Sequence, residues 1–269
     1  MELRERIVQL FRKTATELPE DIISALKEAY KKESPIGKDI LSNIIKNIEQ
    51  AKIKSRPICQ DTGTPFVHVK HPREYSQKEL RKVINEAADI ATKEVPLRPN
   101  AVDTLTGENI GNVPIIYFEE ADELKIDLLL KGGGSENVSA AYQLPNKELD
   151  AHRDLDGVKK CIIDAVFKAQ GKGCPPYIVG IATGGNIEDV AHRAKKQLLR
   201  KIDDNNTNPE LEKFEKEVTE KINSLGIGPM GLGGSATVLG VKATGGIRHP
   251  ASFFVGVSIS CWCLRRQSL

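Results

Sequence analysis

At 269 residues, the chain is long enough to bury a substantial core in one large domain or two smaller ones. Its 39 Lys and Arg nearly balance 37 Asp and Glu, and a formal net charge of +2 gives no indication of a nucleic-acid or anionic-membrane partner. No stretch reaches the roughly 18 consecutive apolar residues that a membrane span needs. The first residues alternate charged and apolar side chains without a signal-peptide core, so we expect a cytoplasmic protein.

The first 55 residues are predicted to be helical. Apolar residues recur at helical spacing in three successive runs, the second of which opens at Pro19. The segment contains no cluster of titratable residues. We therefore expect residues 1–55 to form a helical scaffold.

Residues 56–269 are predicted to form one continuous body of mixed α/β (α+β) fold. Short apolar runs bounded by Gly and Pro indicate strands, and apolar residues three and four positions apart indicate helices. In chain order we expect a strand at 66–69, a helix at 77–94, a β-hairpin of 113–118 and 124–130, a helix at 157–169, a strand at 177–182, helices at 187–202 and 209–225, and a glycine-rich, strand-like end from residue 226.

Four short segments combine glycine with polar or sulfur-containing side chains, and all lie at predicted strand ends or in loops. They are ICQDTGT at 58–64, KGGGSEN at 131–137, GKGCPPY at 171–177 and GVSISCWCLRR at 256–266. Loops held on a rigid sheet are where reactive groups can converge while staying accessible. We therefore look for the chemistry of this protein in these four segments.

The five cysteines fall into three kinds of position. Cys161 lies in the middle of a predicted helix beside two isoleucines, which favours a small core residue. Cys59 and Cys174 lie in Gly- and Pro-rich loops, where no regular element would bury them. Cys261 and Cys263 would share one face of a strand, so periodicity does not choose between them.

The cysteine spacing argues against zinc, because the chain has neither C-x-x-C nor H-x3–5-H. Three widely separated cysteines could instead hold three corners of a 4Fe–4S cluster. Its fourth iron could then bind a substrate oxygen and act as a Lewis acid. The residues alone indicate a metal site without fixing its kind.

An acidic residue and a run of glycines accompany these cysteines. Asp61 lies two residues after Cys59, where a carboxyl group could transfer a proton, or could simply cap the turn before Gly63. The glycines at 132–134 would bring backbone N–H groups close to an anion, or could serve as a hinge. Both alternatives stay open for both features.

The histidines and one further glycine loop carry weaker signals. His249 lies beside Arg248 in the glycine-rich loop GGIRHPAS and has the strongest claim to a role, whereas His68 in a predicted strand is expected to face solvent. Residues 183–186 lie between a strand and a helix as a phosphate loop would, but they match neither nucleotide-binding glycine pattern. No role is assigned to His71, His152 and His192.

Together the segments resemble the class I, iron–sulfur-dependent fumarate hydratases and their relatives, the L-tartrate dehydratases. The motifs CQDTGT, KGGGSEN, CPPY followed by a strand and GGN, and H-x-A-S leading to S-C-x-x-x-R occur in the order of that family. The resemblance covers the chain from about residue 50 onward. It implies that Cys59, Cys174 and Cys261 hold a 4Fe–4S cluster with one open iron, and it favours Cys261 over Cys263.

The resemblance also implies roles for residues that touch a small dicarboxylate substrate. Gln60 and Asp61 are similar to substrate-contacting residues, with Asp61 as proton donor or acceptor. Arg98 is similar to an arginine that pairs with a substrate carboxylate, for which bidentate geometry is suited. His249 matches a substrate-contacting histidine, and Gly133 lies in the glycine run that lines the site.

One departure from single-chain members concerns the C-terminal side. In those members a further domain follows the third cysteine, whereas this sequence ends eight residues after Cys261. The resemblance therefore implies the two-subunit form, in which a separate β subunit completes the active site, with an expected α2β2 assembly.

The sequence leaves alternatives open for the substrate and for the class of function. Fumarate hydration to L-malate is the leading hypothesis, and L-tartrate dehydration would use the same cluster. A non-catalytic iron–sulfur redox sensor and a nucleotide-binding protein using residues 183–186 are the alternatives of other classes.

Overall fold

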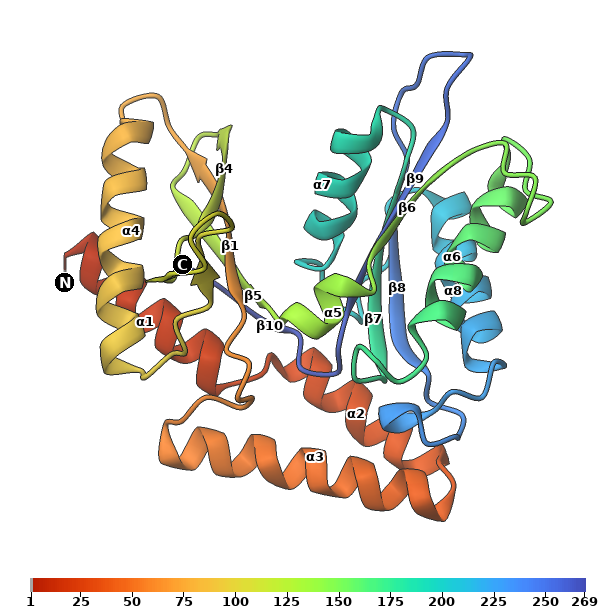
Figure 1. Cartoon of the computed structure of the whole chain (residues 1–269), viewed down its shortest axis with the longest axis horizontal. Coiled ribbons are helices and arrows are strands. Elements are labelled where there is room, and N and C mark those ends of the chain that lie inside the picture. Colours follow the sequence, from red (N-terminus) through yellow and green to blue (C-terminus); the bar gives the residue numbers. More distant parts are fainter. Residues whose placement is uncertain (1) are drawn as a thin grey trace. The chain divides into compact units, whose positions relative to one another are not determined.

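The computed structural model describes residues 2–269 and confirms a mixed α/β fold that begins with helices (Figure 1). The chain divides into two compact units. The first contains the residues up to Pro19, Ile45–Gly133 and Cys263–Leu269, and the second contains Glu20–Ile44 and Gly134–Trp262. These bounds differ from the division near residue 55, which stays a prediction. None of the helices in residues 2–269 is both long and apolar enough to span a bilayer.

Three helices occupy the N-terminal region where helical periodicity predicted them. They are α1 (Leu3–Thr16), α2 (Glu20–Lys32) and α3 (Pro35–Lys54). In the second unit, the buried carboxylate of Glu33 follows α2 and accepts hydrogen bonds from Ser235 Oγ and the backbone N–H of Ala236. This contact attaches α2 to the glycine-rich segment that precedes the last strands.

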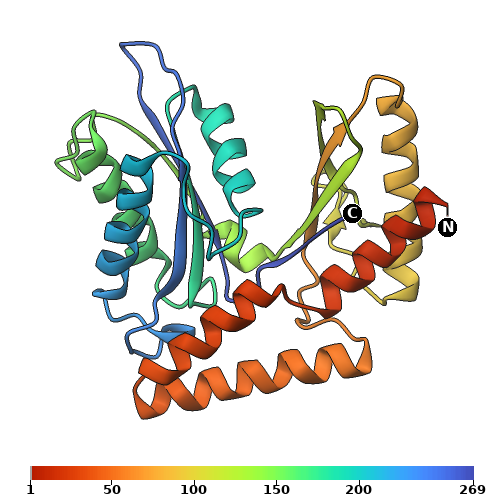
Figure 2. The same cartoon turned by 180° about the vertical axis from the view of Figure 1, so that it is seen from behind.

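The first unit contains a four-stranded sheet with the order β10-β5-β1-β4. Its strands are β1 (Thr64–His71), β4 (Ile115–Glu120), β5 (Lys125–Lys131) and β10 (Arg265–Ser268), and a separate two-stranded sheet is formed by β2 (Ala101–Val102) and β3 (Asn109–Gly111). Helices α1 and α4 (Gln77–Glu94) cover one face (Figures 1 and 2). Alternate residues such as Val67, Val69 and Leu128 point into this core.

The predicted β-hairpin of 113–118 and 124–130 is wrong. Both strands exist, but β1 lies between them, parallel to β4 and antiparallel to β5. Consecutive strands are often, but not always, neighbours in a sheet, and here β1, which is buried along almost its whole length, takes the place between them. The loop after β4 therefore crosses over β1 instead of making a tight turn.

The second unit has a four-stranded sheet with the order β6-β9-β7-β8. Its strands are β6 (Ala140–Gln143), β7 (Tyr177–Thr183), β8 (Val238–Thr244) and β9 (Phe254–Ser260). Helices α6 (Leu155–Ala169) and α8 (Pro209–Asn223) cover one face, and α7 (Ile187–Gln197) covers the other (Figures 1 and 2). β7 is buried on both faces, as its continuous apolar sequence predicts.

Close packing and capping explain the positions of these helices. An added Cβ at Gly180 would lie 2.1 Å from the carbonyl oxygen of Ala194, so only glycine lets α7 approach the sheet so closely. Helix α6 begins at Asp154, whose carboxylate accepts a 2.7 Å hydrogen bond from Gly157 N. Helix α8 begins with Asn208 as N-cap and a proline in its first turn.

Two short elements lie in the glycine-rich segments. The segment KGGGSEN forms a short helix, α5 (Gly133–Asn137), rather than a simple loop, and a 3-10 turn η1 spans Pro229–Gly231. Cys261 and Cys263 do not lie in a strand, because β9 ends at Ser260 and β10 begins at Arg265. The expectation that these two cysteines share one face of a strand is therefore wrong.

Candidate functional site

The carboxylate of Asp61 is held by two backbone N–H groups in the first unit. Oδ1 accepts a 3.0 Å hydrogen bond from Gly63 N, and Oδ2 accepts a 2.8 Å hydrogen bond from Gly133 N. The first bond is the turn cap that the sequence allowed, and the second joins the CQDTGT and KGGGSEN segments. The turn-cap interpretation of Asp61 is thus confirmed, and its carboxylate lies half-buried where the two glycine-rich segments meet. Its part in proton transfer stays a prediction.

Glycine is required on both sides of this carboxylate. Gly63 has φ +86°, and an added Cβ there would lie 2.8 Å from the Leu130 carbonyl carbon at the end of β5. An added Cβ at Gly132 would lie 3.0 Å from Asp61 Oδ2. The turn can therefore lie directly against the end of β5, which brings the carboxylate to the Gly133 amide.

Arg98 is attached to the same loop through its backbone. Arg98 N donates to Thr62 Oγ1 at 2.9 Å, and Asn112 Nδ2 donates to Arg98 O at 2.9 Å. Thr62 and Asn112 are buried, whereas the Arg98 side chain is exposed. The structure thus fixes the backbone of Arg98 to Thr62, the residue that follows Asp61, while the Arg98 side chain stays exposed. Gln60 is also exposed on this loop.

The sequence did not indicate that Thr62, Asn112 and Arg265 hold this loop in place. Arg265 is almost completely buried on β10, and its guanidinium nitrogen Nη1 donates a 2.7 Å hydrogen bond to the backbone oxygen of Asp61. A buried arginine needs several acceptors. The signal in the sequence was the uncommon Arg265-Arg266 pair inside an otherwise strand-like segment.

Cys174 and Cys261 lie side by side in the second unit. The antiparallel pairing of β7 with β9 sets Ile178 opposite Ser260, and Trp262 N donates a 3.2 Å hydrogen bond to Cys174 O. Both cysteines are half-buried. Cys174 has φ +60°, a left-handed conformation that is uncommon for a side chain other than glycine or asparagine.

Tyr177, the last residue of the GKGCPPY segment, has a shifted pKa. The pKa of Tyr177 is raised to about 12, mainly by burial; the hydrogen bond from the Gly173 N–H acts against this rise, and smaller electrostatic effects of Cys174 and Cys261 add to it. The Tyr177 hydroxyl therefore stays neutral and can donate a hydrogen bond.

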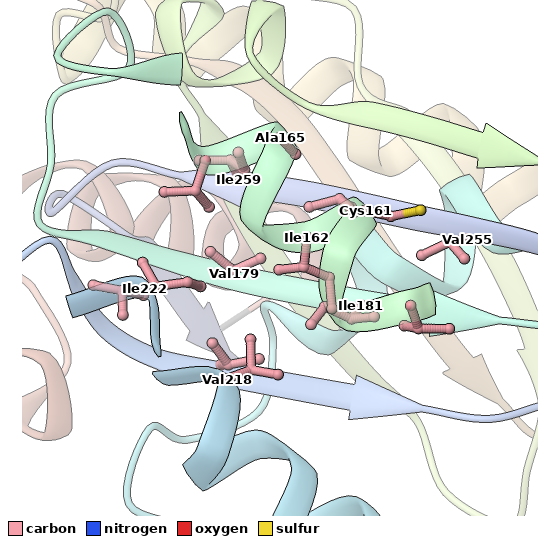
Figure 3. Packing of buried hydrophobic residues seen from close by; sticks show 14 of the residues in the cluster. Cys161, Ile162, Ala165, Val179, Ile181, Val218, Ile222, Val255 and Ile259 are labelled. Carbon is pink, nitrogen blue, oxygen red and sulfur yellow. The ribbon is translucent and has the colours of Figure 1, made fainter. Parts of the chain in front are cut away.

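The remaining two cysteines are buried. Cys161 packs among the aliphatic side chains of the second unit's core, which confirms it as a packing residue (Figure 3). Burial, with a smaller effect of Asp164, raises the pKa of the Cys161 thiol to about 11. Cys263 is only 2% exposed, in contrast to half-buried Cys261.

His249 lies in the exposed loop between β8 and β9 of the second unit. Its Nδ1 accepts a 3.1 Å hydrogen bond from Ala251 N. Arg248 supports the loop, since it donates to the backbone oxygens of His249 and Pro250 and its guanidinium lies 4.9 Å from the ring centroid of Phe253. The loop geometry thus leaves Nε2 of His249 as the ring nitrogen available to a ligand.

The expectation that His68 faces solvent is wrong. His68 is only 3% exposed, and its ring stacks on Tyr117 with centroids 6.0 Å apart. The cause is the position of β1 inside the sheet, because strands on both sides place neighbouring side chains against the ring.

The loop at 183–186 does not have the geometry of a phosphate cradle. Gly184 N donates to Phe254 O and Gly185 N donates to Ile247 O, so these amides already bind backbone carbonyls. The Asn186 side chain caps α7. This arrangement argues against the nucleotide-binding alternative.

Comparison with known proteins identifies the family. Residues 4–269 match the profile of the family described as "Fumarate hydratase (Fumerase)". The chain belongs to this family. The resemblance inferred from the four motifs is therefore confirmed.

Relatives within the fumarate hydratase family carry two kinds of name. A Geobacillus stearothermophilus protein named "Putative fumarate hydratase class I" is 43% identical over 98% of this chain, which spans 54% of that protein's length. A Methanocaldococcus jannaschii protein named "Putative L(+)-tartrate dehydratase subunit alpha" is 44% identical over 99% of this chain and 96% of its own length. The "L(+)-tartrate dehydratase subunit alpha" of Escherichia coli K12 is 32% identical, with 99% and 90% covered.

The three candidate cysteines have the chemistry of iron–sulfur ligands. No three His, Cys, Asp or Glu side chains within residues 2–269 are grouped as ligands of one ion. Cys59 belongs to the first unit, and Cys174 and Cys261 belong to the second. All three are half-buried thiols on loops, and thiolates are the ligands that iron–sulfur clusters use. The chemistry and exposure of each of these thiols thus fit a cluster ligand.

Proposed function

We propose that this chain is the α subunit of an iron–sulfur hydro-lyase that interconverts fumarate and L-malate. The observation that carries the proposal is the Asp61 carboxylate, which two backbone amides hold at a half-exposed position two residues after Cys59. Membership of the fumarate hydratase family supports hydro-lyase chemistry on a dicarboxylate. The separate placements of Arg98 and His249 in exposed loops are compatible with contact to a substrate.

Cys59, Cys174 and Cys261 would hold the 4Fe–4S cluster. Their partial exposure distinguishes them from buried Cys161 and Cys263. When bound through three thiolates, the cluster supplies a Lewis-acidic iron that polarises the hydroxyl group added to or lost from the substrate. The preference for Cys261 over Cys263 is supported by its exposure.

We assign proton transfer to Asp61. Hydration adds a proton and a hydroxyl group across the double bond, so one group must deliver or remove the proton. The Gly63 and Gly133 amides orient the carboxylate and leave its remaining lone pairs for that purpose. A held carboxylate loses little conformational freedom when the substrate arrives.

Binding of the dicarboxylate is assigned to four further residues. Arg98 would pair with one substrate carboxylate through its planar guanidinium. Gln60 and His249 would orient the substrate, and Gly133 would line the site next to Asp61.

A separate β subunit is proposed to complete the active site in an α2β2 assembly and to supply a threonine-type base. Two of the relatives are named as alpha subunits, and the chain covers at least 90% of each. We place the assembly in the cytoplasm, because a reducing compartment protects cysteines of this kind.

L-Tartrate dehydration is the second candidate. The relative named as an L(+)-tartrate dehydratase subunit is as similar to the chain as the relative named fumarate hydratase, and the chain matches its whole length more closely. Tartrate differs from malate by one further hydroxyl group. The same Asp61 and Arg98 functions would serve both substrates.

The proposal is tested by anaerobic co-expression with the β subunit, followed by visible absorption of the purified complex and by fumarate and L-tartrate assays. We expect the broad thiolate-to-iron absorption of a 4Fe–4S cluster, lost on substitution of Cys59, Cys174 or Cys261 by Ser. Cys263→Ser is the matched control and should keep the absorption. Retention in Cys261→Ser with loss in Cys263→Ser would reassign the third ligand, and a wild-type complex without a cluster would overturn the proposal.

A further inference from the structure

The loop that carries Cys174 is fixed to its surroundings at several points, all within the second unit. The loop spans residues 171–176 between α6 and β7. Cys174 has φ +60°, and a side chain keeps such a conformation only where neighbouring contacts enforce it. Within the loop, Cys174 N donates a 3.2 Å hydrogen bond to Gly171 O. Further contacts of the loop come from Tyr177 and from the glycine-rich segment 228–234, neither of which has a role in the proposed reaction.

The hydroxyl group of Tyr177 makes two hydrogen bonds to the backbone that precedes Cys174. It donates a 2.6 Å hydrogen bond to Gln170 O and accepts a 3.1 Å hydrogen bond from Gly173 N. Tyr177 is completely buried. An added Cβ at Gly173 would lie 2.9 Å from Cε1 of the Tyr177 ring, so the loop lies directly against the ring. Tyr177 thus fixes the peptide between Lys172 and Gly173, one residue before Cys174.

The glycine-rich segment fixes the other end of the loop. Met230 N donates a 2.7 Å hydrogen bond to the carbonyl oxygen of Pro175, the residue after Cys174. Gly231 has φ +78°, and an added Cβ there would lie 2.5 Å from Gly171 Cα. Two backbones therefore meet without side chains between them, and the peptide after Cys174 cannot move independently of the segment.

The cysteine itself is joined to the chain that carries the second thiol. The Cys174 carbonyl accepts the hydrogen bond from Trp262 N, one residue after Cys261. Any movement of the loop would change the separation of Cys174 from Cys261. Besides this direct hydrogen bond, the contacts of Tyr177 and of segment 228–234 restrain such movement.

We propose that Tyr177, assisted by segment 228–234, is a positioning residue that holds Cys174 at a fixed distance from Cys261. The consequence for a bound cluster rests on the proposed function, whereas the effect on the Cys174 thiol does not. Tyr177→Phe removes one hydroxyl group and keeps the ring that packs in the core. Tyr142→Phe is the matched control, because Tyr142 is half-buried against the same core and donates a 2.8 Å hydrogen bond to Asp164 Oδ2, away from the cysteine loop.

The first measurement uses the full chain without cluster and follows alkylation of individual cysteines by mass spectrometry. We expect Tyr177→Phe to raise the alkylation rate of Cys174 roughly two- to tenfold, the factor that corresponds to the loss of one ordinary hydrogen bond. Tyr142→Phe should leave that rate unchanged, and Cys59 serves as the internal reference in both variants. An unchanged Cys174 rate in Tyr177→Phe overturns the proposal, as does an equal rise at all cysteines, since that result reports general unfolding.

The second measurement uses the reconstituted complex and follows loss of visible absorption in air. Tyr177→Phe should lose its cluster several times faster than wild type and Tyr142→Phe, with thermal unfolding temperatures of the two variants compared as a control for stability. Equal rates of cluster loss would contradict the positioning role. A wild-type complex that binds no cluster would instead contradict the proposed function and leave the alkylation result standing. Gly231→Ala, which has no room for its methyl group, should raise Cys174 alkylation in the same way as Tyr177→Phe.

Discussion

The backbone N–H of Gly133 donates a 2.8 Å hydrogen bond to Oδ2 of Asp61, 72 positions earlier in the chain. This bond joins two glycine-rich segments that are far apart in sequence and holds the carboxylate to which we assign proton transfer. It makes the chemistry of Asp61 depend on the backbone of KGGGSEN.

Asp61→Asn tests the assigned proton transfer. The amide oxygen keeps one acceptor for a backbone N–H, but the side chain no longer exchanges a proton at neutral pH. We expect kcat of the complex to fall roughly 10²- to 10⁴-fold, while the free energy of unfolding changes by less than about 1.5 kcal/mol. Steady-state kinetics and urea unfolding check the two halves, and a variant with near wild-type kcat would remove Asp61 from the chemistry.

Gly132→Ala tests how closely the carboxylate must be held. The new Cβ would lie 3.0 Å from Asp61 Oδ2, so the carboxylate or the glycine run must shift. We expect kcat to fall by about tenfold to a hundredfold, because small displacements of reacting groups are costly. Gly134→Ala is the comparison, since its Cβ would meet only Lys172 O at an ordinary 3.6 Å. Equal losses in the two variants would contradict this account.

Thiol reactivity separates the candidate ligands from the packing cysteines. In the cluster-free chain, half-buried Cys59, Cys174 and Cys261 should be alkylated well before buried Cys161 and Cys263. Burial has raised the pKa of Cys161 to about 11, so its thiolate fraction at about pH 8 is on the order of one in a thousand. Peptide mass spectrometry over time gives the order, and early modification of Cys161 would contradict the packing assignment.

A charged network supports β8, the strand before the His249 loop, and gives a pH-dependent stability. Burial tends to raise the pKa of Asp204, but hydrogen bonds from Arg200 and Lys242 outweigh it and lower the pKa below the ordinary value of 3.8. Asp204 therefore stabilises the fold above that value, and its contribution is lost as pH falls through the lowered pKa.

Asp204→Asn should accordingly destabilise the chain at about pH 7 by about 1 kcal/mol, a value reduced for the third of the side chain that faces water. The difference from wild type should shrink as the solution is acidified below the ordinary aspartate pKa. Chemical unfolding at several pH values measures it, and a difference that grows on acidification would refute the network's contribution.

Local patterns in the sequence predicted the helices well, because their apolar stripes and caps depend on neighbouring residues. In the structure, the side chains of Asn186, Asn208 and Asp154 also cap the N-termini of helices, which the apolar spacing did not indicate. Helix α7 ends at Gln197, five residues before the predicted end. The apolar residues after Gln197 continue the helical spacing in sequence, although they lie in a turn.

Long-range pairing escaped local patterns. The order of β4, β1 and β5 depends on a strand about 50 positions away, and the same insertion buries His68. For the site, residue type and loop position marked Asp61 and Cys174 as candidates. The Gly133 amide on Asp61 and the Tyr177 bridge were not, because hydrogen bonds of this kind leave no periodic trace in sequence.

The most direct test of the central claim is an anaerobic assay of the cluster-loaded α–β complex with fumarate and, separately, with L-tartrate. We predict hydration of fumarate to L-malate that disappears in Cys174→Ser and persists in Cys263→Ser. Activity with L-tartrate alone would select the second candidate. A complex that holds the full cluster and converts neither substrate would contradict the hydro-lyase assignment and favour the redox-sensor alternative.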